Sequence, residues 1–485
     1  MGTRVNGRLL GEKLAAMGKA ATWSPKVLSR LEELVREGEE AQLFRVNPLD
    51  FAARKAIAGQ EATDLFLHAA KAGLFHMEWN LVCPSCGDAV ESFRTLSALH
   101  SSYHCSVCDM KSEAALDDYI QVTFTVSPDV REIAFHHPEN LSAEDFHYKY
   151  HFSTGAKIPG GPHFAEAVPM LVKSLGFVGP DQRKRFALES STGTLVFSDL
   201  AHHASATVPV DGQPAGAAQN LAIRIEDGKL VPDLPAVSPG KLVVTVENRM
   251  PGRGSVMVMQ RPPGAVPLRL EFAPFLSGRK LITTQTFRTL FSSEVIRGND
   301  GISVRDITIL FTDLKGSTAL YERIGDLKAF SLVQQHFDKL SGAVVRNNGA
   351  FVKTIGDAVM ASFLTPLDAV RAARDMLKEI ARFNQGLASR DLLLKIGMHA
   401  GPCIAVTLNE RLDYFGQSVN IAARVQGLAG AEEVYVTDAV FGFPGVKRAL
   451  AGFKAFSGKV RLKGIAEDIQ VYRIAAAAQP GKLGA

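Results

Sequence analysis

An apolar strand that runs directly into an aspartate constrains the fold of this chain more than any other feature. The segment at residues 306–326 reads DITILFTDLKGSTALYERIGD. Its first part is typical of a strand buried on both faces, and Asp313 ends it just before a helix begins. Burying a carboxylate costs free energy unless it is paired or binds a metal. Asp313 is therefore either a cap of the following helix or a metal ligand.

The elements after this strand favour the metal. Two helices are followed by AFVKTIGDAVMASF, which reads as a β-hairpin that turns at Gly356 and Asp357, then by a helix and the strand LLLKIGMHAG. This βαββαβ order predicts a ferredoxin-like sheet in which the first strand and the hairpin lie side by side. Asp357 alone could be part of an ordinary surface turn. Two facing carboxylates, Asp313 and Asp357, would repel each other unless a divalent cation lay between them.

Composition excludes several classes of protein. The 485 residues predict roughly two to four domains, and 46% hydrophobic residues are enough to fill their cores. The 54 basic and 50 acidic side chains give a net charge of +4, which is too balanced for a nucleic-acid-binding surface along the whole chain. No apolar run approaches the length of about 20 residues that a membrane helix needs. The N-terminus also lacks the apolar core of a signal peptide, so we expect a cytoplasmic protein.

The order of predicted elements indicates a multidomain α+β protein. Residues 1–80 are helical up to a final strand, an order compatible with a winged-helix-like unit, and residues 81–118 hold a cysteine motif. Residues 119–285 are short apolar or alternating runs between turn residues, which predicts a β-rich, sandwich-like domain. A helix and linker at 286–304 lead to the ferredoxin-like domain at 305–475.

The cysteine motif is CPSCGDAVESFRTLSALHSSYHCSVC. Its two CxxC pairs have the separation typical of zinc ribbons, and they consist of Cys83, Cys86, Cys105 and Cys108. Four thiolates close a tetrahedral zinc site with no open position, so the predicted role is structural. Redox-active disulfides are the main alternative, and His104 could replace one cysteine ligand.

Three blocks of the C-terminal third resemble the catalytic domain of class III nucleotidyl cyclases. ILFTDLKGST, FVKTIGDAVMASF and LDYFGQSVNIAARV occur in the order of that family, and the resemblance extends from about Asp306 to Ile474. The preceding region is similar to an uncharacterised region that lies ahead of this domain in some soluble bacterial members. The resemblance therefore covers about a third of the chain with chemically specific motifs.

The resemblance implies a role for each matching residue. Asp313 and Asp357 match the two metal-binding aspartates, and Leu314 would offer its backbone carbonyl to a metal. Lys353 and Asp413 match the pair that reads the purine. A carboxylate can accept a hydrogen bond from the adenine amine while a lysine donates to the neighbouring ring nitrogen, so the pair predicts ATP over GTP. Members that prefer guanine usually have a Glu and Cys pair there.

The resemblance also supplies the residues that act on the phosphates. Asn420 and Arg424, four residues apart on one helical face, match the residues that hold the ribose and meet charge on the α-phosphate. Lys463, in RLKG, matches the lysine that binds the terminal phosphates. Two Mg²⁺ or Mn²⁺ ions per site are implied.

The implied function is adenylate cyclase activity, which converts ATP to 3′,5′-cyclic AMP and pyrophosphate at a homodimer interface. In the family, the metal aspartates of one domain meet the purine lysine, asparagine and arginine of another, so a chain with one such domain must pair with itself. A guanylate cyclase, a catalytically silent nucleotide-binding module and a DNA-binding transcription factor are the alternatives. The intact set of site residues argues against the silent module, and the balanced charge argues against DNA binding.

Overall fold

The computed structural model forms two compact units. It describes residues 5–99, 102–113, 116, 119–153, 155–265, 270–292, 296, 301–386 and 392–476. The first unit runs to Leu276, apart from residues 95–98 and 115–118, which belong with the second unit from Ser277 onward. Within this described part, none of the helices has the length and apolar character needed to cross a membrane.

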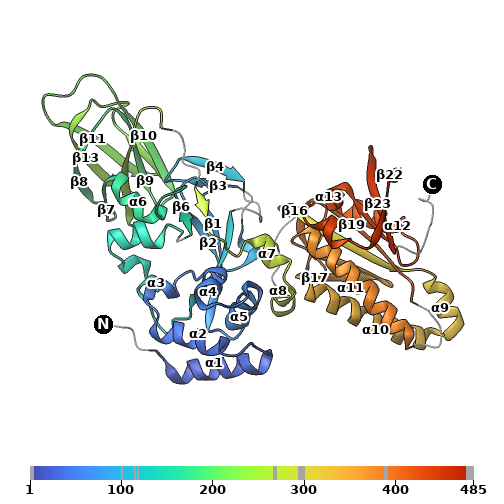
Figure 1. Ribbon diagram of the computed structural model, residues 1–485. Helices are drawn as coiled ribbons and strands as arrows, with labels where there is room; N and C mark the ends of the chain where they lie inside the picture. The colour runs from blue at the N-terminus through green and yellow to red at the C-terminus, as the bar shows by residue number, and fades with distance from the viewer. Residues whose placement is uncertain are drawn as a thin grey trace. The chain divides into compact units, whose positions relative to one another are not determined.

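The first unit opens with five helices that lead into a small sheet (Figure 1). The helices are α1 (Gly7–Ala20), α2 (Val27–Glu37), α3 (Glu40–Leu43), α4 (Pro48–Lys55) and α5 (Gly59–Lys71). The sheet has the order β2-β1-β5 and consists of β1 (Phe75–Val82), β2 (Ala89–Phe93) and β5 (Ile120–Val126). A separate hairpin, β3 (Ser102–Cys105) with β4 (Met110–Glu113), lies between β2 and β5 in the sequence.

Two four-stranded sheets make up the β-rich part of the first unit. Their orders are β10-β9-β14-β7 and β12-β11-β13-β8, and both contribute to one apolar core. The strands are β7 (Val172–Val178), β8 (Arg183–Ser190), β9 (Gly193–Asp199), β10 (Ala204–Val210), β11 (Gln219–Glu226), β12 (Lys229–Pro232), β13 (Gly240–Asn248) and β14 (Gly254–Arg261). Alternating burial along β11 and β13 gives each strand one core face and one outer face, as a sandwich requires.

Short elements connect these parts of the first unit. They are η1 (Leu96–Ala98), η2 (Ala134–His136), η3 (Pro138–Asn140), the π-helix η4 (Asp145–Tyr150), β6 (Ala156–Lys157), α6 (Phe164–Leu171) and β15 (Glu271–Phe272). By contact, η1 belongs with the second unit.

The second unit begins with two short helices, α7 (Gly278–Ile282) and α8 (Gln285–Leu290). The sequence predicted a helix and linker over 286–304, of which residues 293–295 and 297–300 lie outside the described part. The break falls at Thr283 and Thr284, whose hydroxyls donate to the carbonyl of Lys280 at 3.0 and 2.9 Å. Such hydroxyl bonds compete with the helix's own backbone bonds, which explains the break.

The second unit has an eight-stranded sheet with the order β17-β18-β16-β19-β21-β23-β22, and β20 is paired to β19. Its first four strands are antiparallel neighbours in the ferredoxin-like arrangement that the sequence predicted. The elements are β16 (Ile302–Leu314), α9 (Ser317–Ile324), α10 (Asp326–Arg346), β17 (Gly349–Ile355), β18 (Ala358–Phe363), α11 (Pro366–Gln385), β19 (Leu394–Leu408), β20 (Arg411–Phe415), α12 (Gln417–Gly427), β21 (Val434–Thr437), α13 (Asp438–Phe441), α14 (Val446–Ala449), β22 (Phe453–Arg461) and β23 (Asp468–Ala476).

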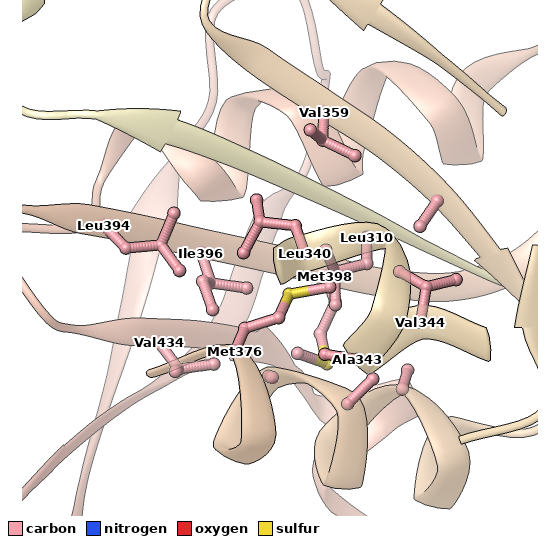
Figure 2. Packing of buried hydrophobic residues seen from close by; sticks show 14 of the residues in the cluster. Leu310, Leu340, Ala343, Val344, Val359, Met376, Leu394, Ile396, Met398 and Val434 are labelled. Carbon is pink, nitrogen blue, oxygen red and sulfur yellow. The ribbon is translucent and has the colours of Figure 1, made fainter. Parts of the chain in front are cut away.

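One face of this sheet is covered by α10 and α11. Figure 2 shows Leu310 and Ile396 of the sheet together with Leu340 of α10 and Met376 of α11 in one apolar cluster. Residues two apart on a strand point to the same face, so Leu394, Ile396 and Met398 all belong to this core.

The opposite face of the sheet carries α12. Gly397 alternates with the core residues of β19, and a side-chain carbon there would overlap the backbone of Gln426 on α12. Glycine is required at this position because the helix and the strand approach each other closely. The helix that carries Asn420 and Arg424 is thereby packed directly on the central strand.

Candidate active site and four-cysteine cluster

Asp313 is the last but one residue of β16 and is paired with Lys395 of β19. The two side chains form an ion pair, with Lys395 Nζ 3.3 Å from Asp313 Oδ2. The helix after the strand has Gly316 as its N-cap and receives no side-chain cap bond, so the capping interpretation of Asp313 does not hold. Asp313 and Lys395 alternate with core residues on their strands, so both side chains project from the face that carries α12.

Asp357 lies in the turn between β17 and β18, beside the end of β16. The N–H of Val359 donates to Thr312 Oγ1 at 3.1 Å, which continues the β16–β18 ladder up to this turn. The Oδ2 atom of Asp357 is buried and has no hydrogen-bond partner among the described residues. An unpaired buried carboxylate oxygen in a turn beside the strand end that carries Asp313 fits a hard divalent cation, which prefers oxygen ligands.

Leu314 is the last residue of β16, and its backbone carbonyl is the group that it could offer to a metal. Its side chain is 4% exposed and belongs to the core between the sheet and α10. The residues that could hold a divalent ion are therefore two carboxylates and one carbonyl from neighbouring positions of the sheet.

Lys353 and Asp413 are brought together from strands that are far apart in sequence. Lys353 Nζ lies 2.5 Å from Asp413 Oδ2, and the side chains are 39% and 7% exposed, respectively. A β-bulge precedes Lys353, since the register of β17 against β18 shifts between Phe351 and Lys353. Lys353 lines a cavity of about 1020 Å³, and this volume is at the upper end of the range for small-molecule sites.

Asn420 and Arg424 both lie on α12, separated by one helical turn. Asn420 is exposed, whereas Arg424 is half-buried, and its Nη1 atom has no hydrogen-bond partner in the described part of the chain. A methyl group on Gly464 would lie only 3.2 Å from that Nη1 atom. The guanidinium thus keeps an unused donor, which is the property needed to bind a phosphate oxygen.

Lys463 lies in the turn between β22 and β23 that also contains Gly464. The flanking Leu462 and Ile465 are buried in a small cluster with Ile421 and Val425 of α12. This packing holds the exposed Lys463 next to the helix of Asn420 and Arg424. The three residues assigned to the phosphates and ribose are therefore neighbours in one chain.

Two residues near the site were missed by sequence reasoning. Period-two alternation in LLLKIGMHAG would have placed Lys395 opposite to the core face, but its pairing with Asp313 depends on strand register. No sequence pattern marks Gly464, next to Lys463, as part of the site. Its φ of 72° and its closeness to Arg424 are visible only in three dimensions.

The four cysteines of the first unit converge as predicted. One ligand atom from each of Cys83, Cys86, Cys105 and Cys108 lies within 4.8 Å of all the others. Each CxxC knuckle ends in a left-handed residue, Gly87 with φ 69° and Asp109 with φ 58°.

The chemistry of this cluster fits a zinc ion. Burial raises the pKa of the Cys86 thiol, while hydrogen bonds from Cys105 and Cys108 lower the pKa of Cys83. Three buried cysteines and the half-buried Cys108, with sulfur atoms this close, are stable as thiolates only with a cation among them, and tetrahedral zinc matches their number and spacing.

Two family models match the chain in succession. Residues 12–289 match a model described as a family of unknown function, DUF5939, and residues 302–475 match the adenylate and guanylate cyclase catalytic domain. The first match covers more than half of the 485 residues.

Curated relatives share the C-terminal part. The chain is 29% identical over 205 residues to the pH-sensitive adenylate cyclase of Mycobacterium tuberculosis, covering 41% of this chain and 47% of the relative. It is 28% identical over 194 residues to an adenylate cyclase of Anabaena cylindrica, covering 36% and 38%. This chain spans less than half the length of these relatives.

Solved structures of cyclases align with the same part. The adenylyl cyclase CyaB from P. aeruginosa aligns at 20% identity and a TM-score of 0.32, covering 37% of this chain and 98% of that one. The guanylyl cyclase Cya2 aligns at 21% identity and a TM-score of 0.32, covering 38% and 98%. By the two family models, the chain belongs to the family of unknown function DUF5939, and its C-terminal part is a class III adenylate/guanylate cyclase catalytic domain.

Proposed function

We propose that this chain is an adenylate cyclase that converts ATP to 3′,5′-cyclic AMP and pyrophosphate. The observation that carries the proposal is the pair of Lys353 and Asp413, 2.5 Å apart, with Lys353 on a cavity of about 1020 Å³. A lysine donor beside a carboxylate acceptor complements the ring nitrogen and the amine of adenine. Guanine presents a carbonyl at the position of that amine, and a carboxylate would repel it.

Asp313, Asp357 and the carbonyl of Leu314 would hold the divalent metal, Mg²⁺ or Mn²⁺, with two ions per site. The support is the unpaired, buried Oδ2 atom of Asp357 beside the end of β16. When bound, such ions lower the pKa of the ribose 3′-hydroxyl and neutralise charge on the triphosphate. The two carboxylates would hold the ions at the end of β16 and in the turn between β17 and β18.

The remaining residues act on the substrate directly. Asn420 orients the ribose, so that its 3′-oxygen points at the α-phosphorus. Arg424 donates the free N–H groups of its guanidinium to the α-phosphate, where negative charge grows as the new bond forms. Lys463 binds the terminal phosphates and follows them as pyrophosphate leaves.

A second copy of this chain would complete the site. The domain carries one metal-binding set and one purine-and-phosphate set, and two-fold pairing would place each set opposite its complement. Large apolar side chains are exposed near both sets: Ile355 at 51%, Ile404 at 41%, Leu408 at 46% and Phe415 at 64%. Such clustered exposure favours an interface.

We also propose that the four-cysteine cluster of the first unit holds one structural zinc ion. The four ligand atoms are preorganised, and no fifth ligand position is needed for this role. The zinc would stabilise the two knuckles and take no part in the cyclase reaction.

The proposal is tested by incubating the purified full-length chain with ATP or GTP and Mg²⁺ or Mn²⁺, and by measuring both cyclic nucleotides. We expect cyclic AMP from ATP and a much lower rate with GTP. A preference for GTP would replace the adenylate assignment by guanylate cyclase. No turnover of either nucleotide with either metal would favour a silent nucleotide-binding module.

A further inference from the structure

The short helix α8 contacts both strands that carry the purine-reading pair. Gln285 Oε1 accepts a hydrogen bond of 2.8 Å from the N–H of Phe351, two residues before Lys353. Arg288 Nη1 donates one of 2.7 Å to the carbonyl of Leu412, the residue before Asp413. All of these residues belong to the second unit, so one six-residue helix bridges two strands of the same domain.

Each of the contacted strands has a strand partner on one side only in the described part of the chain. β17 lies at the end of the sheet order and pairs with β18, and β20 pairs with β19. Edge strands expose unpaired N–H and carbonyl groups, and the bulge before Lys353 weakens the ladder further. The two bonds from α8 therefore supply the partners that a neighbouring strand would give elsewhere.

Arg288 is itself fixed by several contacts. Its Nε atom donates to the carbonyl of Ile282 at 3.1 Å, and its guanidinium carbon lies 5.2 Å from the ring centre of Tyr414. The Tyr414 hydroxyl donates to the same carbonyl of Ile282 at 3.2 Å. Arg288 and Tyr414 thus hold the backbone on both sides of Asp413.

We propose that Gln285 and Arg288 are positioning residues for purine recognition, which set the distance and orientation between Lys353 and Asp413. This inference rests on the proposed function and deepens it. The side chain of Lys353 is 39% exposed and loses rotamer freedom when it is fixed, so the backbone that carries it must be well placed. Displacing either strand by about 1 Å would misalign donor and acceptor with the purine edge.

The test compares substitutions in the full-length chain. Gln285→Ala and Arg288→Ala each remove one bond to a purine-carrying strand. Arg279→Ala is the matched control, because Arg279 also donates to a backbone carbonyl at 2.8 Å, that of Asp306 in the first half of β16. Arg288→Lys keeps a donor for Leu412 and tests rescue. The measurements are KM and kcat with ATP and GTP, and the Kd of a fluorescent ATP analogue that is not turned over.

We expect Gln285→Ala and Arg288→Ala to raise KM and Kd for the ATP compounds about tenfold and to lower the ratio of ATP to GTP specificity by a similar factor, with a smaller change in kcat. Arg288→Lys should recover part of the ratio, and Arg279→Ala should keep it at the wild-type value. A circular dichroism spectrum and melting curve show whether each variant is folded.

Two results would overturn the inference. Folded Gln285→Ala and Arg288→Ala with wild-type affinity and selectivity would show that α8 does not position the pair. An equal change in Arg279→Ala would show that any loosening of this helical segment has the same effect. If the wild-type chain prefers GTP, the adenylate assignment fails, and the positioning role is still judged by the change in selectivity and Kd.

Discussion

At the scale of single residues, substitution of Asp357 gives the most direct test of the proposed chemistry. Its Oδ2 atom is buried and unpaired among the described residues, so its charge stabilises no contact of the protein there. Asp357→Asn keeps the shape of the side chain but removes the negative charge. We expect turnover to fall about 100-fold or more with Mg²⁺ or Mn²⁺, while the melting temperature stays the same or rises.

The control for this substitution is Asp306→Asn in the first half of β16, where the side chain is 61% exposed. It should retain most of the activity. Substantial turnover by a folded Asp357→Asn protein would remove Asp357 from the metal-binding set.

Lys395 places a positive charge beside Asp313. Its ammonium group is 3.3 Å from Asp313 Oδ2 and must compete with a divalent ion for the same oxygen. We expect Lys395→Met to tighten Mn²⁺ binding to the free protein about tenfold, measured by titration calorimetry or by the Mn²⁺ resonance signal. Lys378→Met on α11, where Lys378 is 58% exposed, should not change it. Unchanged or weaker binding by Lys395→Met would contradict this competition.

At the scale of elements, the sequence predicted those features that depend on local pattern. The strand ending in Asp313, the hairpin with Asp357 at its turn and the helix with Asn420 and Arg424 were readable because each has its own periodicity or turn signal. The bulge before Lys353 was not readable, because it exists only in the register of β17 against β18. The bridge made by α8 was equally hidden, since its partners lie far away along the chain.

The long helix α10 contains a buried histidine that should make the cyclase domain sensitive to acid. His336 is 0% exposed, and neither ring nitrogen has a hydrogen-bond partner among the described residues. Burial lowers its pKa from the ordinary 6.5 to about 4. The unfolded chain therefore binds a proton first as the pH falls, so stability is complete above pH 6.5 and is lost as the pH falls toward 4.

His336→Leu should remove this loss, which amounts to at most about 3 kcal/mol of unfolding free energy. Urea unfolding at pH 7.5 and at pH 5 measures it. The free energy of unfolding of the variant, relative to that of the wild type, should be higher at pH 5 than at pH 7.5. A difference that does not depend on pH would show that His336 has the same pKa in the folded and the unfolded chain.

The two cysteine knuckles are elements whose stability should depend on zinc. Elemental analysis of the reduced protein should find about one zinc per chain. Cys83→Ser should lose the metal and lower the melting temperature of the first unit, without a direct effect on the cyclase reaction. Cys403→Ala is the control, because this buried cysteine lies on β19 and outside the cluster, and it should keep the zinc. Freshly reduced wild-type protein without zinc would defeat the assignment.

At the scale of the whole molecule, one domain carries two half-sets of site residues. Asp313 and Asp357 lie at the end of β16 and the neighbouring turn, while Arg424 lies on α12. The chain alone does not determine which half-sets act together, because that depends on a second copy. If the site is shared between two copies, each of the two equivalent sites uses the aspartates of one chain and Lys353, Asp413, Asn420 and Arg424 of the other.

A mixture of two inactive variants tests this arrangement. Asp357→Ala alone and Arg424→Ala alone should be inactive, since every site in either homodimer lacks one group. In a mixed dimer, one site collects both defects and the other has neither. Random pairing of equal amounts makes half of the dimers mixed, and half of their sites are intact, so activity should return to about a quarter of the wild-type value.

The mixture must be shown to contain mixed dimers, for example by co-expression with two different tags and purification through both. Two Asp357→Ala preparations with different tags provide the control, because their dimers exchange in the same way but contain no intact site. If tagged mixed dimers of Asp357→Ala and Arg424→Ala form and remain as inactive as this control, each site is built within one chain.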